Sequence, residues 1–504
     1  MNKSRKTRSK ITLGPVITIL ILIVIVIGLS SILSLAGVGG QKTQIVGGDL
    51  ESKLVTINNV LTPSGIKMII TNAVTNLKVF EPFFLLVITL IALGIGKSCG
   101  LFQILFKPLK KINKNWIIVF TLLVGILSSV IGEYSYILLI PLIGIIYQYA
   151  GQKPMLGILT LFIGITVGYG TGLFFSYDDY FLGTLTQASA NVLVDPNYEY
   201  SLSSNIYIMI ASTILLTVSG LYVIKKLLDP KIKKVEIEQE EYKESKKALF
   251  FTAVAGTLMA LFLLYMIIPG MYKSGLLLGE GENYIIRLLG PESPFRQGFL
   301  IIVLLFLMIT SAIYGRLSKN IENTNQYSLG LSKEFEDLGY LFVLLFFTAQ
   351  LAGILEWTNL GEVLVVNLLN LISTFDFSGL LLIILTFISV IIMSILMPSN
   401  TTKWALISPI LVPLFMRANV TPSFTQFVFT SADAVGKTLT PLFTYFIIML
   451  AFLEKYNENE KITIFGTLKK IMPTVLIFAA IWFIFILCWY ITGLPTGIGV
   501  NPTL

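Results

Sequence analysis

The stretch WIIVFTLLVGILSSVIGEYSYILLIPLIGIIYQY, residues 116–149, decides the predicted fold of this chain. Two apolar arms flank a polar centre, Gly-Glu-Tyr-Ser at 132–135. Each arm has about 15 residues, or about 22 Å of helix, whereas the hydrocarbon core of a bilayer is about 30 Å thick. Basic residues lie just outside both arms, at Lys114 and Lys153. Because such residues mark the cytoplasmic side, the pattern predicts a re-entrant hairpin that enters from the cytoplasm and turns inside the membrane.

The composition of the whole chain is that of a membrane protein. Hydrophobic residues make up 55% of the 504 residues and charged residues only 13%, about half the charged share of an ordinary globular domain. Such a chain cannot cover its surface with polar groups, which excludes a soluble enzyme, a disordered protein and a disulfide scaffold. The sequence has no histidine, which excludes His-ligated metal sites, His-containing catalytic triads and His proton relays.

The distribution of charge predicts orientation. The net charge of +8 is concentrated in short loops, which indicates membrane topology rather than nucleic-acid binding. Five basic residues lie within 1–10, and an uncharged stretch over 11–40 follows. That stretch is too long for the apolar core of a secretory signal and predicts a retained helix with a cytoplasmic N-terminus. Further spans are predicted at 83–106, 205–224, 248–269, 298–315, 338–357 and 472–494.

The second half of the chain repeats the organisation of the first. A polar break at 398–403 separates apolar residues 379–397 from a short apolar arm over 404–416. This pattern predicts a second hairpin, at about 379–416, which enters from outside.

Each predicted hairpin, the first at about 116–149, is followed by a helix that Gly or Pro interrupts, at about 155–183 and about 424–452. The two halves are then 1–230 and 231–504. The predicted fold is an all-α integral membrane protein with about nine transmembrane helices plus two re-entrant hairpins in inverted repeats. This is the layout of a secondary transporter.

Acidic residues next to the first interruption are candidates for chemistry. Asp178 and Asp179 fit three interpretations: a divalent metal site for glycosyl or phosphoryl transfer, a solvated end of a span, and a cation or proton site that lines a cavity. The spacing does not say which carboxylate points inward. A Gly-Lys-Ser at 96–98 lacks the upstream glycine of a phosphate-binding loop. We therefore expect no nucleotide or other cofactor, and transport would draw on an ion gradient.

Polar residues at the second hairpin and the second interrupted helix form another candidate site. Ser399, Asn400 and Thr401 lie at a helix break, where free N–H groups attract carboxylates and free carbonyls attract cations. The alternative is an ordinary outer loop. Asp433 and Lys437 are four residues apart and can pair on one helical face. That pair is either structural or part of a substrate or ion site.

Several short motifs resemble the aminobenzoyl-glutamate transporter (AbgT) family of bacterial membrane proteins. The resemblance spans nearly the whole chain, and in combination the motifs are quite specific. They are VLTPSG at 60–65, IPL at 140–142, AQ at 349–350 with WTNLG at 357–361, Ser399 and the residues through Leu406, and TPL at 440–442. The resemblance implies about nine spans, two hairpins, inverted repeats and a homodimer in the bacterial cytoplasmic membrane. Family members are associated with uptake of aminobenzoyl-glutamate and with export of sulfonamide antimetabolites.

The same resemblance implies roles for individual residues. The family's acidic positions for ion or proton coupling fall on Glu133, Asp179 and Asp433. Its substrate positions include Thr401, Trp404 and Pro422.

The chain also departs from the family pattern. The family's asparagines in the two broken helices are Gly172 and Lys437 here, and an arginine before the second aspartate is Thr430. These departures fall where family members bind cation and substrate. A lysine ammonium has the charge of a cation and three donors. We therefore hypothesise that Lys437 takes the cation's place beside Asp433, and that sodium is not used there.

The sequence thus predicts a transporter, not an enzyme, that works by alternating access on a small aromatic or carboxylate-bearing solute. Trp404 would stack on the substrate, and Lys403 or Lys437 would attract a carboxylate. Proton or sodium would be the coupling ion. One alternative is a sodium-coupled dicarboxylate or organic-anion symporter of the related ion-transporter group, and another is a membrane glycosyl- or phosphotransferase. The predicted substrate-binding residues are Ser399, Asn400, Thr401, Trp404, Pro422 and Lys437, and no resident metal is expected.

Overall fold

The computed structural model describes residues 13–235, 240–336, 338–374, 378–457 and 461–504. Within these residues, nine helical segments are long and apolar enough to cross a membrane. The prediction of an all-α, multi-pass membrane protein with about nine spans is therefore confirmed. Two of the nine segments, Lys114–Ile131 and Gly379–Leu396, are first arms of the predicted hairpins, so the turning of those hairpins inside a membrane stays a prediction.

The first half contains a small sheet that the sequence analysis missed. Strands β1 (Gly39–Val46) and β2 (Asp49–Thr56) pair antiparallel across the two-residue turn Gly47-Gly48. Both glycines have positive φ, 61° and 96°, as a tight hairpin turn requires. The helices of this half are α1 (Pro15–Leu35), α2 (Pro63–Lys78), α3 (Glu81–Ser98), α4 (Leu101–Phe106), α5 (Lys114–Leu127), α6 (Tyr134–Tyr149), α7 (Pro154–Val167), α8 (Tyr177–Leu193) and α9 (Ile206–Val223).

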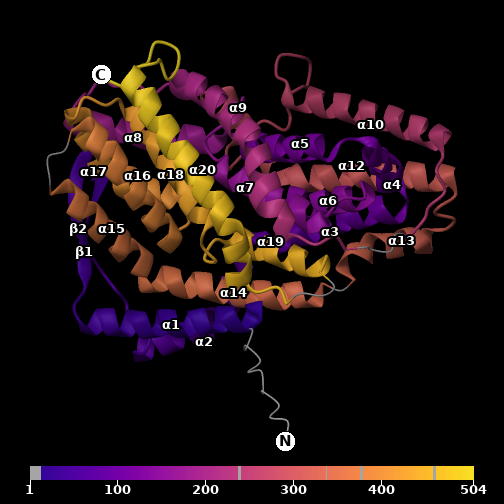
Figure 1. Cartoon of the computed structure of the whole chain (residues 1–504), viewed down its shortest axis with the longest axis horizontal. Helices are drawn as coiled ribbons and strands as arrows, with labels where there is room; N and C mark the ends of the chain where they lie inside the picture. The colour runs from indigo at the N-terminus through magenta and orange to yellow at the C-terminus, as the bar shows by residue number, and fades with distance from the viewer. Residues whose placement is uncertain (1–12, 236–239, 337, 375–377, 458–460) are drawn as a thin grey trace, which may run out of the picture.

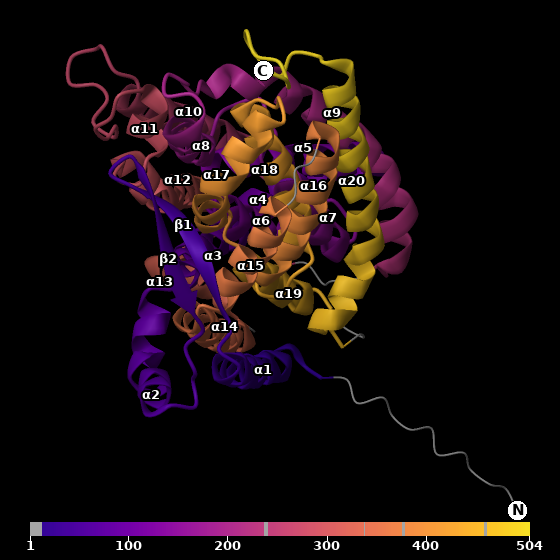
Figure 2. The same cartoon turned by 90° about the vertical axis from the view of Figure 1, so that its left-hand side faces the viewer.

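The second half is helical throughout the residues that the structure describes. Its long helices alternate with short ones that lie between them in the sequence (Figures 1 and 2). The helices are α10 (Lys246–Ile267), α11 (Tyr284–Leu289), α12 (Pro294–Ser318), α13 (Thr324–Ser332), α14 (Gly339–Thr358), α15 (Leu360–Ser373), α16 (Gly379–Leu396), α17 (Asn400–Arg417), α18 (Pro422–Thr438), α19 (Thr444–Lys455) and α20 (Ile464–Thr492).

The two ends of the first predicted hairpin, α5 and α6, lie beside each other. Lys114, at the start of α5, and Lys153, just beyond α6, both contact the carboxylate of Asp229, with Nζ–Oδ distances of 2.5 and 2.8 Å. Nearby, Lys231 donates to the carbonyl oxygen of Lys470 in the first turns of α20. The first helix pair therefore opens at the N-terminal end of α20.

The second predicted hairpin, α16 and α17, opens at the other end of α20. A side chain added at Gly379, the first residue of α16, would collide with the backbone of Ala418 beyond α17 and with the hydroxyl of Tyr490 near the end of α20. Helix α20 has 29 residues, so it is about 43 Å long. Opening at opposite ends of a membrane-length helix is the geometry that an inverted repeat requires.

The two interrupted helices have longer arms than the sequence analysis predicted. Helix α7 ends at Val167 and α8 runs from Tyr177 to Leu193, ten residues beyond the predicted end at 183. In the second half, α18 and α19 are separated by residues 439–443. Helix α18 is buried over its whole length and packs against α16, α17, α7, α8 and α20. Figures 1 and 2 show α16, α17 and α18 together on one side of α20. The polar residues of α18 therefore lie in the middle of the molecule.

A buried carboxylate joins the second interrupted helix to α3. Glu334 is only 1% exposed, and its two oxygens contact Lys97 of α3 at 3.0 Å and Lys455 at the end of α19 at 2.5 Å. Burial by itself raises the pKa of the Glu334 carboxyl, but the two ammonium groups outweigh burial and hold that pKa below its ordinary value. This three-membered junction fixes the lower-polarity end of α19 to the rest of the fold.

The hairpin prediction is tested by cysteine labelling in a Cys488→Ser background, because Cys488 is exposed. Lys114→Cys and Lys153→Cys are both expected to react with an impermeant maleimide from the cytoplasmic side only. Ser378→Cys, at the exposed start of the second hairpin, should react from the opposite side. Labelling of residues 114 and 153 from different sides would mean a complete span and would contradict the re-entrant hairpin.

Candidate functional site

Asp433 lies at the centre of a buried polar cluster formed by α16, α17 and α18. Its side chain is 0% exposed. Its Oδ1 atom accepts a hydrogen bond from Lys403 of α17 and lies 2.8 Å from the hydroxyl of Ser394 on α16. The Lys403 ammonium, also 0% exposed, donates to the same hydroxyl at 2.7 Å. A charge that is buried this deeply is tolerated only when it is paired, so Lys403 and Asp433 hold three helices together.

Lys437 is the second cation of the cluster. It lies one turn after Asp433 on α18, with its Nζ atom 3.6 Å from Asp433 Oδ2. The same ammonium lies 3.4 Å from the centre of the Tyr169 ring, which is cation–π contact. Among the described residues, Asp433 is the one carboxylate within ion-pair distance of either lysine. With all three groups ionised, the cluster carries one positive charge in excess.

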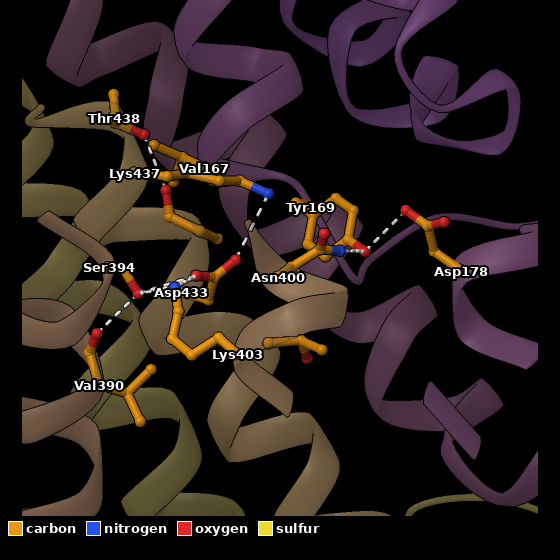
Figure 3. A network of polar contacts seen from close by, with 12 residues as sticks. Val167, Tyr169, Asp178, Val390, Ser394, Asn400, Lys403, Asp433, Lys437 and Thr438 are labelled. Carbon is orange, nitrogen blue, oxygen red and sulfur yellow. Dashed lines mark hydrogen bonds and ion pairs between the residues drawn. The ribbon is translucent and has the colours of Figure 1, made fainter. Parts of the chain in front are cut away.

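Tyr169 connects this cluster to the first half of the chain. It lies in the interruption between α7 and α8, between Gly168 and Gly170. Its hydroxyl donates to Asp178 Oδ2 at 2.9 Å and accepts a hydrogen bond from the side-chain amide of Asn400. Figure 3 shows one continuous network from Ser394 and Lys403, through Asp433 and Lys437, to Tyr169 and Asp178. The first interrupted helix, the second interrupted helix and the tip of the second hairpin meet there.

The structure distinguishes the two adjacent aspartates. Asp179 closes a capping box at the start of α8: its Oδ2 accepts from the backbone N–H and the hydroxyl of Ser176, both at 2.8 Å. Asp178 instead faces Tyr169. The predicted coupling residue Asp179 is thus placed as a helix cap, and its neighbour lies in the network.

Three other predicted site residues lie apart from the network. Glu133 is exposed at the tip of the first hairpin. Pro422 is the first residue of α18, 11 positions before Asp433 and so about 16 Å away along the helix. Ser399 bonds Thr402 at 2.9 Å within the first turn of α17. Thr401 is half-buried in that turn.

Trp404 is fully buried and has protein partners on all sides. Its indole N–H donates to the carbonyl oxygen of Leu182 at 3.2 Å and to the hydroxyl of Thr186 at 3.0 Å, both on α8. Its ring centre lies 4.5 Å from that of Phe429. In this conformation Trp404 joins α17 to α8 and α18. Stacking on a substrate would require α8 and α17 to separate.

Sequence reasoning did not find Tyr169 or Ser394 and gave Lys403 less weight than Lys437. An aromatic residue among alternating glycines was a usable signal for Tyr169, because an irregular segment exposes backbone that such a ring can cover. Ser394 is one of several hydroxyls in an apolar helix, and only the packing of α16 on α18 selects it.

Comparison with known proteins gives a consistent result. The model of the AbgT putative transporter family matches residues 10–504. The p-aminobenzoyl-glutamate transport protein of Escherichia coli (strain K12) is 24% identical over 498 residues, which covers 97% of this chain and 94% of that protein.

Two solved structures are also similar to this chain. One is the Alcanivorax borkumensis YdaH transporter, with 23% identity, a TM-score of 0.48, and coverage of 96% of this chain and 100% of that one. The other is Neisseria gonorrhoeae MtrF, of a class described as antimetabolite efflux pumps, with 25% identity, a TM-score of 0.48, and 98% coverage of each chain.

The two lysines are expected to contribute unequally to stability. Lys403→Met removes the direct partner of a fully buried carboxylate and should destabilise the fold by about 3–5 kcal/mol. Lys437→Met leaves the Lys403–Asp433 contact in place and should cost clearly less. Thermal unfolding of the purified variants in detergent, followed by intrinsic fluorescence, measures the difference.

A double-mutant cycle supplies the control. Asp433→Asn should recover part of the stability lost in Lys403→Met, because the unpaired buried charge is then gone. Equal losses for the two lysine variants, or additive losses in the double variant, would contradict the assigned pairing.

Proposed function

This chain belongs to the AbgT putative transporter family, and from that premise we propose that it is a secondary active transporter that moves a small aromatic solute bearing a carboxylate. The proposed mechanism is alternating access by the two inverted halves. We further propose a homodimer in the bacterial cytoplasmic membrane, with the N-terminus in the cytoplasm, as the basic residues within 1–10 favour.

The observation that carries this proposal is the excess positive charge of the Lys403–Asp433–Lys437 cluster. A structural ion pair needs one lysine for one carboxylate, whereas Asp433 has two. Ionisable groups at membrane depth are costly and are retained mainly for function. The second ammonium, that of Lys437, is therefore the group that attracts the carboxylate of a substrate, and Tyr169 covers it in this conformation.

The substrate class follows from this chemistry and from the relative's name. The E. coli relative is named for p-aminobenzoyl-glutamate, which combines an aromatic amine with carboxylates. Aromatic side chains are frequent around the network, with Tyr169 inside it and Trp404 directly behind it. We propose an aminobenzoyl-type acid, or an antimetabolite of similar shape, as the substrate.

The coupling ion is proposed not to be sodium at Asp433. A sodium site requires several oxygen ligands, but Oδ1 of Asp433 bonds Lys403, and Lys437 lies beside Oδ2. The positions at which the family resemblance places asparagine are Gly172 and Lys437, so neither supplies an amide oxygen. The ion gradient would then be a proton gradient, carried by a carboxylate outside the cluster: Asp178, Asp179 or Glu133.

Alternating access gives the Tyr169 network a role. Tyr169 and Asp178 belong to the first half, and Asn400 and Lys437 to the second. Movement of one half against the other must therefore break the hydrogen bond from Asn400 and the cation–π contact. Uncovering Lys437 in this way would admit the substrate carboxylate.

Neither rival function is favoured by a specific contact. A sodium-coupled dicarboxylate symporter would need Asp433 free for its ion. A membrane glycosyl- or phosphotransferase would use Asp178 and Asp179 together on a metal, whereas these carboxylates have separate partners, Tyr169 and Ser176.

The proposal is tested by uptake into sealed vesicles. Purified protein reconstituted into liposomes is expected to accumulate radiolabelled p-aminobenzoyl-glutamate when a gradient is imposed. Lys437→Met should reduce the rate about tenfold or more, since a charge-assisted hydrogen bond contributes about 1.5–3 kcal/mol. The matched control is Lys469→Met, which removes an exposed lysine on α20 and should transport normally. Normal uptake by Lys437→Met would contradict the assigned role.

A further inference from the structure

A pocket with about 370 Å³ of free space lies beside the tip of the first hairpin, open on one side. Three parts of the chain line it: the hairpin turn over 130–134, the start of α8 over 176–178, and the segment from Leu289 to Phe299 that begins α12. Its size is at the lower end of the range for pockets that hold small organic ligands. It is separate from the Lys403–Asp433–Lys437 cluster.

Aromatic rings make up much of the pocket wall. Tyr134 at the start of α6 packs against Phe299 of α12, with ring centres 5.3 Å apart. Phe295 contacts Phe299 edge-on at 6.0 Å. Tyr177 of α8 provides a ring at the start of that helix. Such walls favour a flat aromatic ligand.

Arg296 is the cation of this pocket. Its guanidinium lies 5.0 Å from the centre of the Tyr177 ring, and Nη1 donates to the carbonyl oxygen of Leu289 at 2.9 Å. In the part of the chain that the structure describes, no carboxylate forms an ion pair with it. A guanidinium has five N–H donors in a planar fork that matches a carboxylate. Arg296 is thus a half-buried cation with donor capacity left for an anionic ligand.

Asp178 gives the pocket a second polar group of opposite charge. Its carboxylate lines the pocket and also accepts the hydrogen bond from Tyr169, whose ring covers Lys437. A carboxylate at this position repels a second anion and accepts from an amine. The pocket therefore borders the buried cluster, with the single side chain of Tyr169 between them.

We propose that this pocket is a binding site for a planar aromatic carboxylate, which a solute occupies before it reaches Lys437. Arg296 holds the carboxylate, the rings of Tyr177 and Phe299 contact the ligand ring, and Asp178 accepts from an amino group on the ligand. This inference deepens the proposed function and rests on it for the direction of passage. The binding site itself can be tested without transport.

The test is isothermal titration of the full-length protein in detergent with 4-aminobenzoate, and with 4-aminobenzamide as the uncharged analogue. The unmodified protein should bind the acid about tenfold or more tightly than the amide, because a bidentate contact with Arg296 is worth about 1.5–3 kcal/mol. Arg296→Gln should lose this preference, and Arg296→Lys should keep part of it. Arg417→Gln, an exposed arginine at the end of α17, should bind like the unmodified protein.

The outcomes separate the pocket from the proposed function. Equal binding of the acid by Arg296→Gln and the unmodified protein, with both folded by thermal unfolding, would overturn the pocket assignment. Failure of the unmodified protein to bind 4-aminobenzoate would do the same. Lys437→Met should still bind the acid, since Lys437 does not line the pocket. Loss of binding in Arg296→Gln together with normal transport by Lys437→Met would support the pocket and contradict the proposed role of the cluster.

Discussion

The cost of a charge inside a membrane protein determines how the central helices are arranged. Asp433 is wholly buried on α18 and needs a cation, and Lys403 supplies it from α17 while Ser394 of α16 completes its hydrogen bonding. Both hairpin arms and the interrupted helix are thereby fixed around one carboxylate. Lys437 adds a charge that this arrangement does not need for stability. The same constraint that holds the helices together therefore leaves a cation for function.

Interruptions in the helices place these groups where the two halves meet. Continuous helices would satisfy their own backbone and present side chains only sideways. The break after α7 instead turns Tyr169 towards Lys437 and allows α8 to begin with Asp178 beside the pocket. Tyr169 has hydrogen-bond partners from both halves. One aromatic side chain thus separates the Arg296 pocket from the cluster, and any relative motion of the halves must move it.

Much of the fold could be predicted from the sequence, but less of the site. Apolar length and lysine positions predicted the spans, and Lys114 and Lys153 meet at Asp229 as a shared side requires. Spacing along one helix could suggest Asp433 with Lys437, but not the closer contact with Lys403, which depends on how α17 crosses α18. Asp178 and Asp179 are adjacent in sequence, and only the capping box at Ser176 distinguishes them. The burial of Trp404 against α8 likewise follows from packing between halves.

The central claim is that lysine ammonium groups occupy the place of an inorganic cation at Asp433. The most direct measurement is the initial rate of p-aminobenzoyl-glutamate transport in reconstituted vesicles, with sodium replaced by potassium at fixed pH and fixed membrane voltage. The predicted result is an unchanged rate, because Lys403 and Lys437 already neutralise Asp433. A strong stimulation by sodium, accompanied by a sodium ion bound beside Asp433, would contradict this account.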